Sequence, residues 1–200
     1  MIKILLATNN AHKVKEFKSC FAQKGIELEI VTLAESGFCG DIIEDADSFE
    51  GNARIKAKTL CEYTGMIAVA DDSGLVVDAL DGAPGVFSAR YAGEGCKDID
   101  NVNKLLTELK NKPDQPRSAR FVCSICAIRP DGKELVVFGE SEGEIIDELL
   151  GNNGFGYDPV FYCREFNKTF AELSDEEKNS VSHRGRAVER LAENIAFFGE

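Results

Sequence analysis

Short apolar runs alternate along this chain with stretches in which apolar residues recur at every third or fourth position. The runs 2–7 and 66–70 are brief and almost entirely apolar, which is typical of strands buried on both faces. Apolar residues at helical spacing predict the accompanying helices. They are Val14, Phe17 and Phe21; Phe49, Ala53, Ala57 and Leu60; Ile99, Val102, Leu105, Leu106 and Leu109; and Val188, Leu191, Ile195 and Phe198.

Polar residues at the borders of these stretches predict where each helix begins and ends. The predicted N-caps are Asn10, Ser48, Asp98 and Ser182. Residues 174–177 read as a capping box, and Gly25 and Gly65 as helix stops. The turn sequence 130–133 separates the apolar runs 121–128 and 135–138, which predicts an antiparallel hairpin. Interleaved strands and helices with one hairpin predict an α/β protein with a mixed β-sheet.

Size and charge narrow the functional classes. The chain has 200 residues, which predicts one domain spanning 1–200. Its formal net charge of -12 argues against a nucleic-acid partner, because phosphate backbones are met by basic faces. A small polyanion stays possible where a local basic cluster and a divalent cation reverse the field.

The seven cysteines are odd in number and scattered, and no secretory signal precedes them, so we expect reduced thiols and a cytoplasmic protein. Cys123 and Cys126 have the spacing of a redox or zinc pair but lie in a predicted strand, where residues three apart point to opposite faces. We therefore expect buried structural cysteines. No stretch has the length of a membrane span.

A first polar island, Thr8-Asn9-Asn10 with Lys13, interrupts the opening strand and begins a helix. Free N–H groups at a helix start, short polar side chains and a lysine suit a phosphate. From this segment alone structural capping is the better interpretation. No glycine-rich dinucleotide or P-loop pattern occurs.

A second island, Asp71-Asp72-Ser73-Gly74, follows the apolar run 66–70. Adjacent carboxylates repel each other unless they are solvated or neutralised by a cation, and Mg²⁺ prefers one or two carboxylates with water and substrate phosphates. Glu44 could add a further carboxylate. The equally weighted alternative is a solvated turn in which Gly74 takes a positive φ.

Two more islands lie in the second half of the chain. In the segment 154–159, glycines let backbone approach a ligand and an aromatic ring can stack on a base; a loop that packs its own aromatic rings is the alternative. Ser182-His183-Arg184 places basic residues at a helix start, which is unfavourable unless an anion or electron-rich ligand is near. We expect His12, Lys56 and Lys58 to lie on exposed helix faces, with Lys56 a minor candidate for phosphate contact.

Taken together, the islands resemble the inosine triphosphate pyrophosphatase family, which hydrolyses deaminated purine nucleoside triphosphates to monophosphates and pyrophosphate. The resemblance covers essentially the whole chain. Its motifs are Ala7-Thr8-Asn9-Asn10 with Lys13, Phe49-Glu50-Gly51-Asn52-Ala53, Ala70-Asp71-Asp72-Ser73-Gly74-Leu75, Gly82-Ala83-Pro84-Gly85 with Ser88-Ala89-Arg90-Tyr91, residues 154–159, and Glu177-Lys178 through Ser182-His183-Arg184-Gly185. The family often has Gly where Asn9 stands; Asn tolerates left-handed backbone better than most residues.

The resemblance implies a role for each matching position. Asp72 would be the catalytic carboxylate and, with Glu44, a ligand of Mg²⁺. The implied substrate contacts are Thr8, Asn9, Asn10, Lys13, Ser73, Phe155, Gly156, Tyr157, Asp158, Lys178, His183 and Arg184. The implied fold is an elongated mixed β-sheet flanked by helices, with two lobes around a central cleft, usually as a homodimer.

Chemistry follows from these parts. Asp72 would orient or deprotonate a water that attacks the α-phosphorus, while Lys13 and Lys178 would stabilise charge on the pyrophosphate leaving group. The resemblance implies ITP, dITP and XTP as substrates. His183 and Arg184 could donate to the 6-keto oxygen of these bases, where adenine presents an amino donor. Two alternatives stay open: a metal-dependent phosphatase acting on nucleotide or sugar phosphates, and a nucleotide sensor without turnover.

Overall fold

The computed structural model describes residues 2–199 and contains a seven-stranded sheet in the order β2-β1-β3-β4-β5-β6-β7. The strands are β1 (Ile2–Leu6), β2 (Leu28–Thr32), β3 (Ala68–Val77), β4 (Ser118–Ile128), β5 (Glu134–Ile145), β6 (Phe161–Cys163) and β7 (Lys168–Thr169). β1 is parallel to β2 and β3, whereas β6 is antiparallel to β5 and β7. The predicted α/β fold with a mixed sheet flanked by helices is confirmed.

The main helices are α1 (Ala11–Gln23), α2 (Phe49–Thr64), α3 (Asp98–Lys110), α4 (Asp175–Val181) and α5 (His183–Glu193). Asn10, Ser48 and Ser174 cap α1, α2 and α4 as predicted. The helix α3 begins at Asp98 itself, with Lys97 at the N-cap. In the part of the chain that the structure describes, no helix is both long and apolar enough to cross a membrane.

The chain divides into two compact units; three of the four divisions fall inside β3, β4 and β5, and the fourth lies between α4 and α5. Unit 1 contains the residues up to Asp72, Cys123–Gly139 and the residues from His183 onward. Unit 2 contains Ser73–Val122 and Glu140–Ser182.

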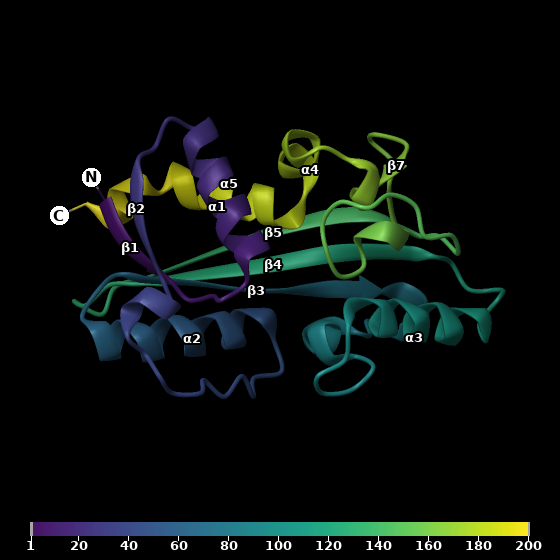
Figure 1. Ribbon diagram of the computed structural model, residues 1–200, viewed down its shortest axis with the longest axis horizontal. Coiled ribbons are helices and arrows are strands. Elements are labelled where there is room, and N and C mark those ends of the chain that lie inside the picture. The colour runs from purple at the N-terminus through teal and green to yellow at the C-terminus, as the bar shows by residue number, and fades with distance from the viewer. Residues whose placement is uncertain (1, 200) are drawn as a thin grey trace. The chain divides into compact units, whose positions relative to one another are not determined.

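In unit 1, helices cover both faces of the sheet: α2 lies against one face, and α1 and α5 against the other (Figure 1). The alternation of side chains along β1 produces this arrangement, because Leu5 packs in the α2 layer while Ile4 and Leu6 pack with α1 and α5. Cys123 and Cys126 follow the same rule in β4, one in each layer. Both are buried free cysteines, as predicted.

In unit 2, a core of aromatic and aliphatic side chains packs against α3. The rings of Phe121, Phe161 and Phe170 have centroids 4.7 to 5.7 Å apart. Val102 and Leu105 of α3 are buried as predicted, but Ile99 is 45% exposed. Ile99 lies in the first turn of α3, so the apolar face of this helix extends past the edge of the core that it covers.

The hairpin of β4 and β5 is confirmed, with Arg129 N donating to Lys133 O at 2.9 Å. The predicted end of the strand 66–70 is wrong. The strand β3 does not end at Ala70 but runs to Val77, and Gly74 does not take a positive φ, so the alternative of a solvated turn is wrong as well. Polar residues continue a strand when each finds partners on its own face, which the surroundings of Asp71 and Asp72 provide.

Candidate active site

The loop after β1 is closed by its own side chains. Asn10 Oδ1 accepts hydrogen bonds from the N–H groups of His12 (2.9 Å) and Lys13 (3.3 Å), and Thr8 Oγ1 accepts from Asn10 N at 3.1 Å. The predicted N-cap at Asn10 is therefore confirmed. Asn9 is exposed and does not take a positive φ, so asparagine at this position causes no strain.

Lys13, in the first turn of α1, points to β3. Its Nζ lies 2.9 Å from Asp71 Oδ2. The same carboxylate oxygen accepts from Arg184 Nε at 3.3 Å and Arg184 Nη2 at 3.2 Å, while Asp71 Oδ1 is buried without a hydrogen-bond partner. Asp71 is thus the shared counter-ion of two cations that come from α1 and α5.

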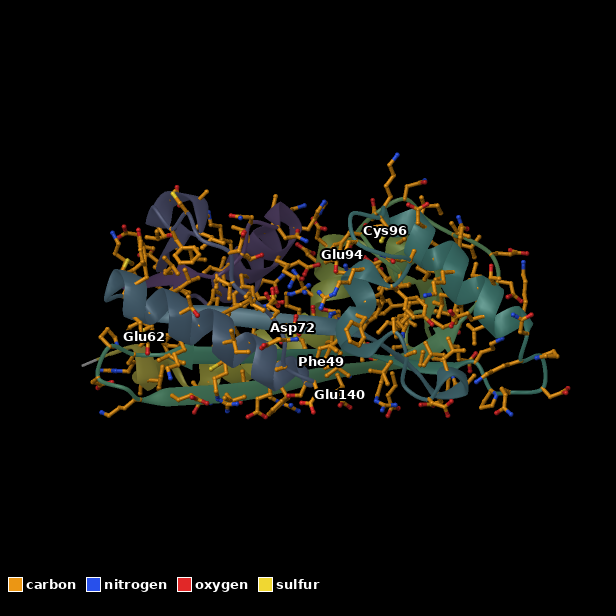
Figure 2. All side chains as sticks on the ribbon, turned by 90° about the horizontal axis from the view of Figure 1, so that it is seen from below. Phe49, Glu62, Asp72, Glu94, Cys96 and Glu140 are labelled. Carbon is orange, nitrogen blue, oxygen red and sulfur yellow. The ribbon has the colours of Figure 1, made fainter. Side chains whose placement is uncertain are left out.

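Asp72 contacts a different set of residues, all on α2 or the loop before it. Asn52 Nδ2 donates to Asp72 Oδ2 at 3.2 Å, and Lys56 Nζ lies 3.4 Å from Asp72 Oδ1. Figure 2 labels Asp72 on β3 beside the end of α2 at which Phe49 lies, whereas Glu62 marks the opposite end of that helix. Neighbouring residues of a strand face opposite sides of the sheet, and this separates the two aspartates.

Lys56 corrects an expectation. Instead of lying on an exposed face, it is only 8% exposed and joins two carboxylates, with its Nζ 2.6 Å from Glu44 Oε2 and 3.4 Å from Asp72 Oδ1. Its position on the helix suggests solvent exposure, but the loop before α2 brings the carboxylate of Glu44 to it. Lys58, on the same helix, is exposed as predicted.

The two aspartates have pKa values displaced in opposite directions. Burial by itself raises the pKa of Asp71, but Lys13 and Arg184 outweigh it and hold that pKa well below the ordinary value. Burial raises the pKa of Asp72, and Lys56 and Lys13 only partly oppose the effect. When the pKa values of two carboxyl groups are displaced in opposite directions, one group commonly has a structural role and the other an acid–base role. The arrangement makes Asp72 the better proton acceptor.

Arg184 begins α5 as predicted but is not a solvated cation. It is 1% exposed, and its guanidinium is held by Asp71 through Nε and Nη2 and by Glu16 through Nη1. His183 is buried beside it. The anions that offset the charge of Arg184 at this helix start are therefore side chains of the protein. Gly139 lets α5 approach β5, since a Cβ there would lie 2.1 Å from His183 O.

In unit 2, the loop 154–158 is organised around Asp158. Asp158 Oδ2 accepts from Phe155 N at 2.8 Å and pairs with Lys178 Nζ at 2.8 Å, and that ammonium lies 5.1 Å from the centre of the Phe155 ring. Gly154 has φ 77°, and a Cβ there would come within 2.0 Å of Asp158 Oδ2, so only glycine fits. Phe155, Asp158 and Lys178 are thus brought together.

Tyr157 and Gly156 connect the loop to the rest of unit 2. Tyr157 is 4% exposed, and its hydroxyl donates to Ser88 O at 2.9 Å. Gly156 N donates to Asp98 Oδ2 at 2.7 Å. Leu75 N donates to Ser88 Oγ at 2.9 Å, which links this segment to β3 just beyond Ser73. The ring of Tyr157 packs in the core of unit 2. This agrees with the alternative interpretation of the segment 154–159, a loop that packs its own aromatic rings.

Several residues without a predicted site role contact the predicted site residues. They are Glu16 and Asn52 in unit 1, and Ser88 and Asp98 in unit 2, of which Asp98 was predicted only as an N-cap. Asn52 and Ser88 stand inside motifs that carried the resemblance, and that was the available signal. Glu16 lies one helical turn after Lys13, but nothing in its local pattern pointed to a partner far along the chain.

A divalent cation fits the Asp72 side of β3. No cluster of three or more His, Cys, Asp or Glu residues suited to a metal occurs among residues 2–199. Glu44 and Asp72 nevertheless supply the one or two hard carboxylates that Mg²⁺ prefers when water and substrate phosphates complete its coordination. With Lys56, these three groups carry one excess negative charge.

Comparisons with known proteins agree with this picture. The model of the Ham1 family matches residues 4–194. The chain is 49% identical over 201 residues to the dITP/XTP pyrophosphatase of Clostridium perfringens, covering 98% of both chains. It is 52% identical over 188 residues to that of Desulfotalea psychrophila, covering 94% of this chain and 82% of the relative. The structure of a HAM1 protein from Coxiella burnetii superimposes with a TM-score of 0.89 at 41% identity, covering 98% of this chain and 100% of that one.

Proposed function

Because this chain belongs to the Ham1 family, we propose that it is a nucleoside triphosphate pyrophosphohydrolase. It converts the deaminated purine nucleotides ITP, dITP and XTP to the monophosphate and pyrophosphate, and so removes them from the nucleotide pool. The resemblance noted from the sequence motifs is confirmed by the family match and by relatives that carry the name dITP/XTP pyrophosphatase. The observation that carries the proposal is the placement of Asp72 with Glu44 around one buried ammonium group.

Asp72 is the proposed catalytic residue. Its raised pKa, its hydrogen bond from Asn52 and its position beside Lys56 suit a carboxylate that orients a water and accepts its proton as the water attacks the α-phosphorus. Glu44 and Asp72 are the proposed ligands of Mg²⁺. When bound, the ion would neutralise phosphate oxygens and favour departure of pyrophosphate.

The remaining proposed contacts are carried over by the resemblance. In unit 1, Thr8, Asn9, Asn10 and Lys13 are assigned to the triphosphate, and His183 and Arg184 to the base. In unit 2, Ser73 and the loop 155–158 are assigned to the nucleotide. Lys178 was also expected near the leaving group, but its pairing with Asp158 favours a role in holding this loop. Tyr157 acts through its buried ring and its bond to Ser88.

We further propose that the 200 residues work as a single functional domain, as a homodimer with Mg²⁺, in the cytoplasm. The acidic charge and the free cysteines support an enzyme of small-molecule metabolism in a reducing compartment. Light scattering of the purified protein tests the dimer, and fractionation of the source cells tests the location.

A panel of nucleoside triphosphates with Mg²⁺ and a pyrophosphate readout tests the activity. Pyrophosphate should be released from ITP, dITP and XTP and far more slowly from ATP and GTP. Orthophosphate as the sole product would identify a phosphatase instead. Tight ITP binding without magnesium and without hydrolysis would identify a sensor.

A further inference from the structure

Two carboxylates hold the guanidinium of Arg184, and neither has a role in the function proposed above. Asp71 accepts from Nε and Nη2 through one oxygen, and Glu16 accepts from Nη1. The three groups come from β3, α1 and α5, all in unit 1. Carboxylates on two sides of a planar guanidinium fix both its position and the orientation of its plane.

Asp71 also contacts Lys13, so one carboxylate oxygen of Asp71 binds the cationic groups of both Lys13 and Arg184. Lys13 Nζ is 2.9 Å from Asp71 Oδ2, the oxygen that accepts from Arg184. On α1, Lys13 and Glu16 are three residues apart and so lie on neighbouring positions of one helix face. A displacement of α1 would therefore move Glu16, which contacts Arg184, and Lys13, which contacts Asp71, together.

Charge distinguishes this side of β3 from the other. Lys13 and Arg184 are balanced by Asp71 and Glu16, whereas Glu44 and Asp72 exceed the single charge of Lys56. A buried ion-pair network whose charges cancel is suited to fixing side chains in place. The side with excess negative charge is suited to a cation.

We propose that Glu16 and Asp71 are positioning residues of the reaction, which act by fixing Arg184 and Lys13 in the orientation that receives the nucleotide. This rests on the proposed function, since the roles of Arg184 and Lys13 come from there. Asp71 couples the residue assigned to the phosphates with the residue assigned to the base. Glu16 keeps the guanidinium plane from turning about its bonds to Asp71.

Glu16→Gln tests the proposal, because it keeps the size of the side chain and leaves Asp71 in place. A charged hydrogen bond becomes a neutral one, so we expect KM for ITP to rise about tenfold, with kcat within a factor of two of the parent. Glu189→Gln is the matched control. Glu189 joins α5 to Lys24 at the end of α1 through an exposed pair, and its loss should leave both constants unchanged.

A double variant separates positioning from a general structural effect. If Glu16 acts through the guanidinium, Glu16→Gln should change KM much less when Arg184 has already been replaced by Lys. An equal rise in both backgrounds, or an unchanged KM in the single variant, would overturn the inference. Failure of the parent protein to release pyrophosphate from ITP would instead contradict the proposed function.

Discussion

Asp71 and Asp72 are neighbours in β3, yet their carboxylates bind different side chains. Lys13 and Arg184 contact Asp71, whereas Asn52 and Lys56 contact Asp72. An adjacent acidic pair in sequence suggests one shared ligand. The alternation of a continuous strand gives each carboxylate its own face and its own charge balance. The two residues should therefore respond differently to the same substitution.

Asp72→Asn should retain the fold and lose most turnover. Its side chain is only partly buried and the change is nearly isosteric, while loss of a general base typically costs about 10²–10⁴-fold in rate. Pyrophosphate release from ITP and the thermal midpoint should both be measured, with Asp81→Asn at an exposed turn as the control. Turnover within a few-fold of the parent would transfer the catalytic role to Asp71 or Glu44.

Asp71→Asn should instead destabilise the protein. The change removes the carboxylate charge that Lys13 and Arg184 share, and breaking a buried ion pair costs about 3–5 kcal/mol. Urea unfolding of the Asp71→Asn and Asp72→Asn variants side by side measures the difference. Equal midpoints would contradict the view that Asp71 anchors the buried network.

Glu44→Gln should raise the magnesium concentration needed for half-maximal activity by about tenfold or more. The variant replaces a charged carboxylate of the proposed metal site with a neutral amide, and changes to groups around a metal commonly weaken its binding by this amount. Activity at saturating magnesium should recover in part, because Asp72 is still present. Glu62→Gln on the exposed face of α2 is the control, since Glu62 is exposed and lies 4.0 Å from Lys58. An unchanged magnesium requirement would remove Glu44 from the metal site.

Base selection should depend on Arg184. Hypoxanthine presents a 6-keto acceptor where adenine presents an amino donor, and sites built around a required hydrogen bond can discriminate by about 10⁴-fold or more. Arg184→Ala would leave Asp71 and Glu16 without their guanidinium, so Arg184→Lys, which keeps the charge, is the preferred variant. Its ITP-to-ATP activity ratio should fall, mainly through loss of ITP activity.

If that ratio is unchanged, the base is read elsewhere, and the loop 155–158 is the next segment to test. The 6-keto argument does not account for rejection of GTP, which has the same group. A clash at the 2-position must then be supposed, and a comparison of ITP, XTP and GTP on the parent protein measures it.

The cysteines should react with thiol reagents in an order set by burial. Burial raises the pKa of Cys20 to about 11 and of Cys123 and Cys126 to about 12, so these thiols stay protonated at pH 8. Cys39 is exposed. Iodoacetamide labelling followed by peptide mapping should modify Cys39 first and the buried cysteines only after unfolding. Rapid labelling of Cys123 in the native protein would contradict this packing.

Local structure was predictable from the sequence because short-range chemistry decides it. The caps at Asn10, Ser48 and Ser174 satisfy N–H groups within three residues, and the turn 130–133 closes a hairpin over a similar distance. The divergence of Cys123 and Cys126 follows from the two-residue period of a strand. The motifs also indicated the family, since their residue types and order are themselves properties of the sequence.

Only the tertiary structure decided which charges meet. Arg184 pairs with Asp71 across 113 residues of chain and with Glu16 across 168, and no local pattern encodes such a distance. Lys56 has the helical spacing of an exposed residue but is buried, and it pairs with Glu44 from the loop before α2. A polar side chain takes its environment from whatever packs over it, and long-range packing assigns that neighbour. For this reason the fold class and family could be predicted from the chain, whereas the different partners of Asp71 and Asp72 could not.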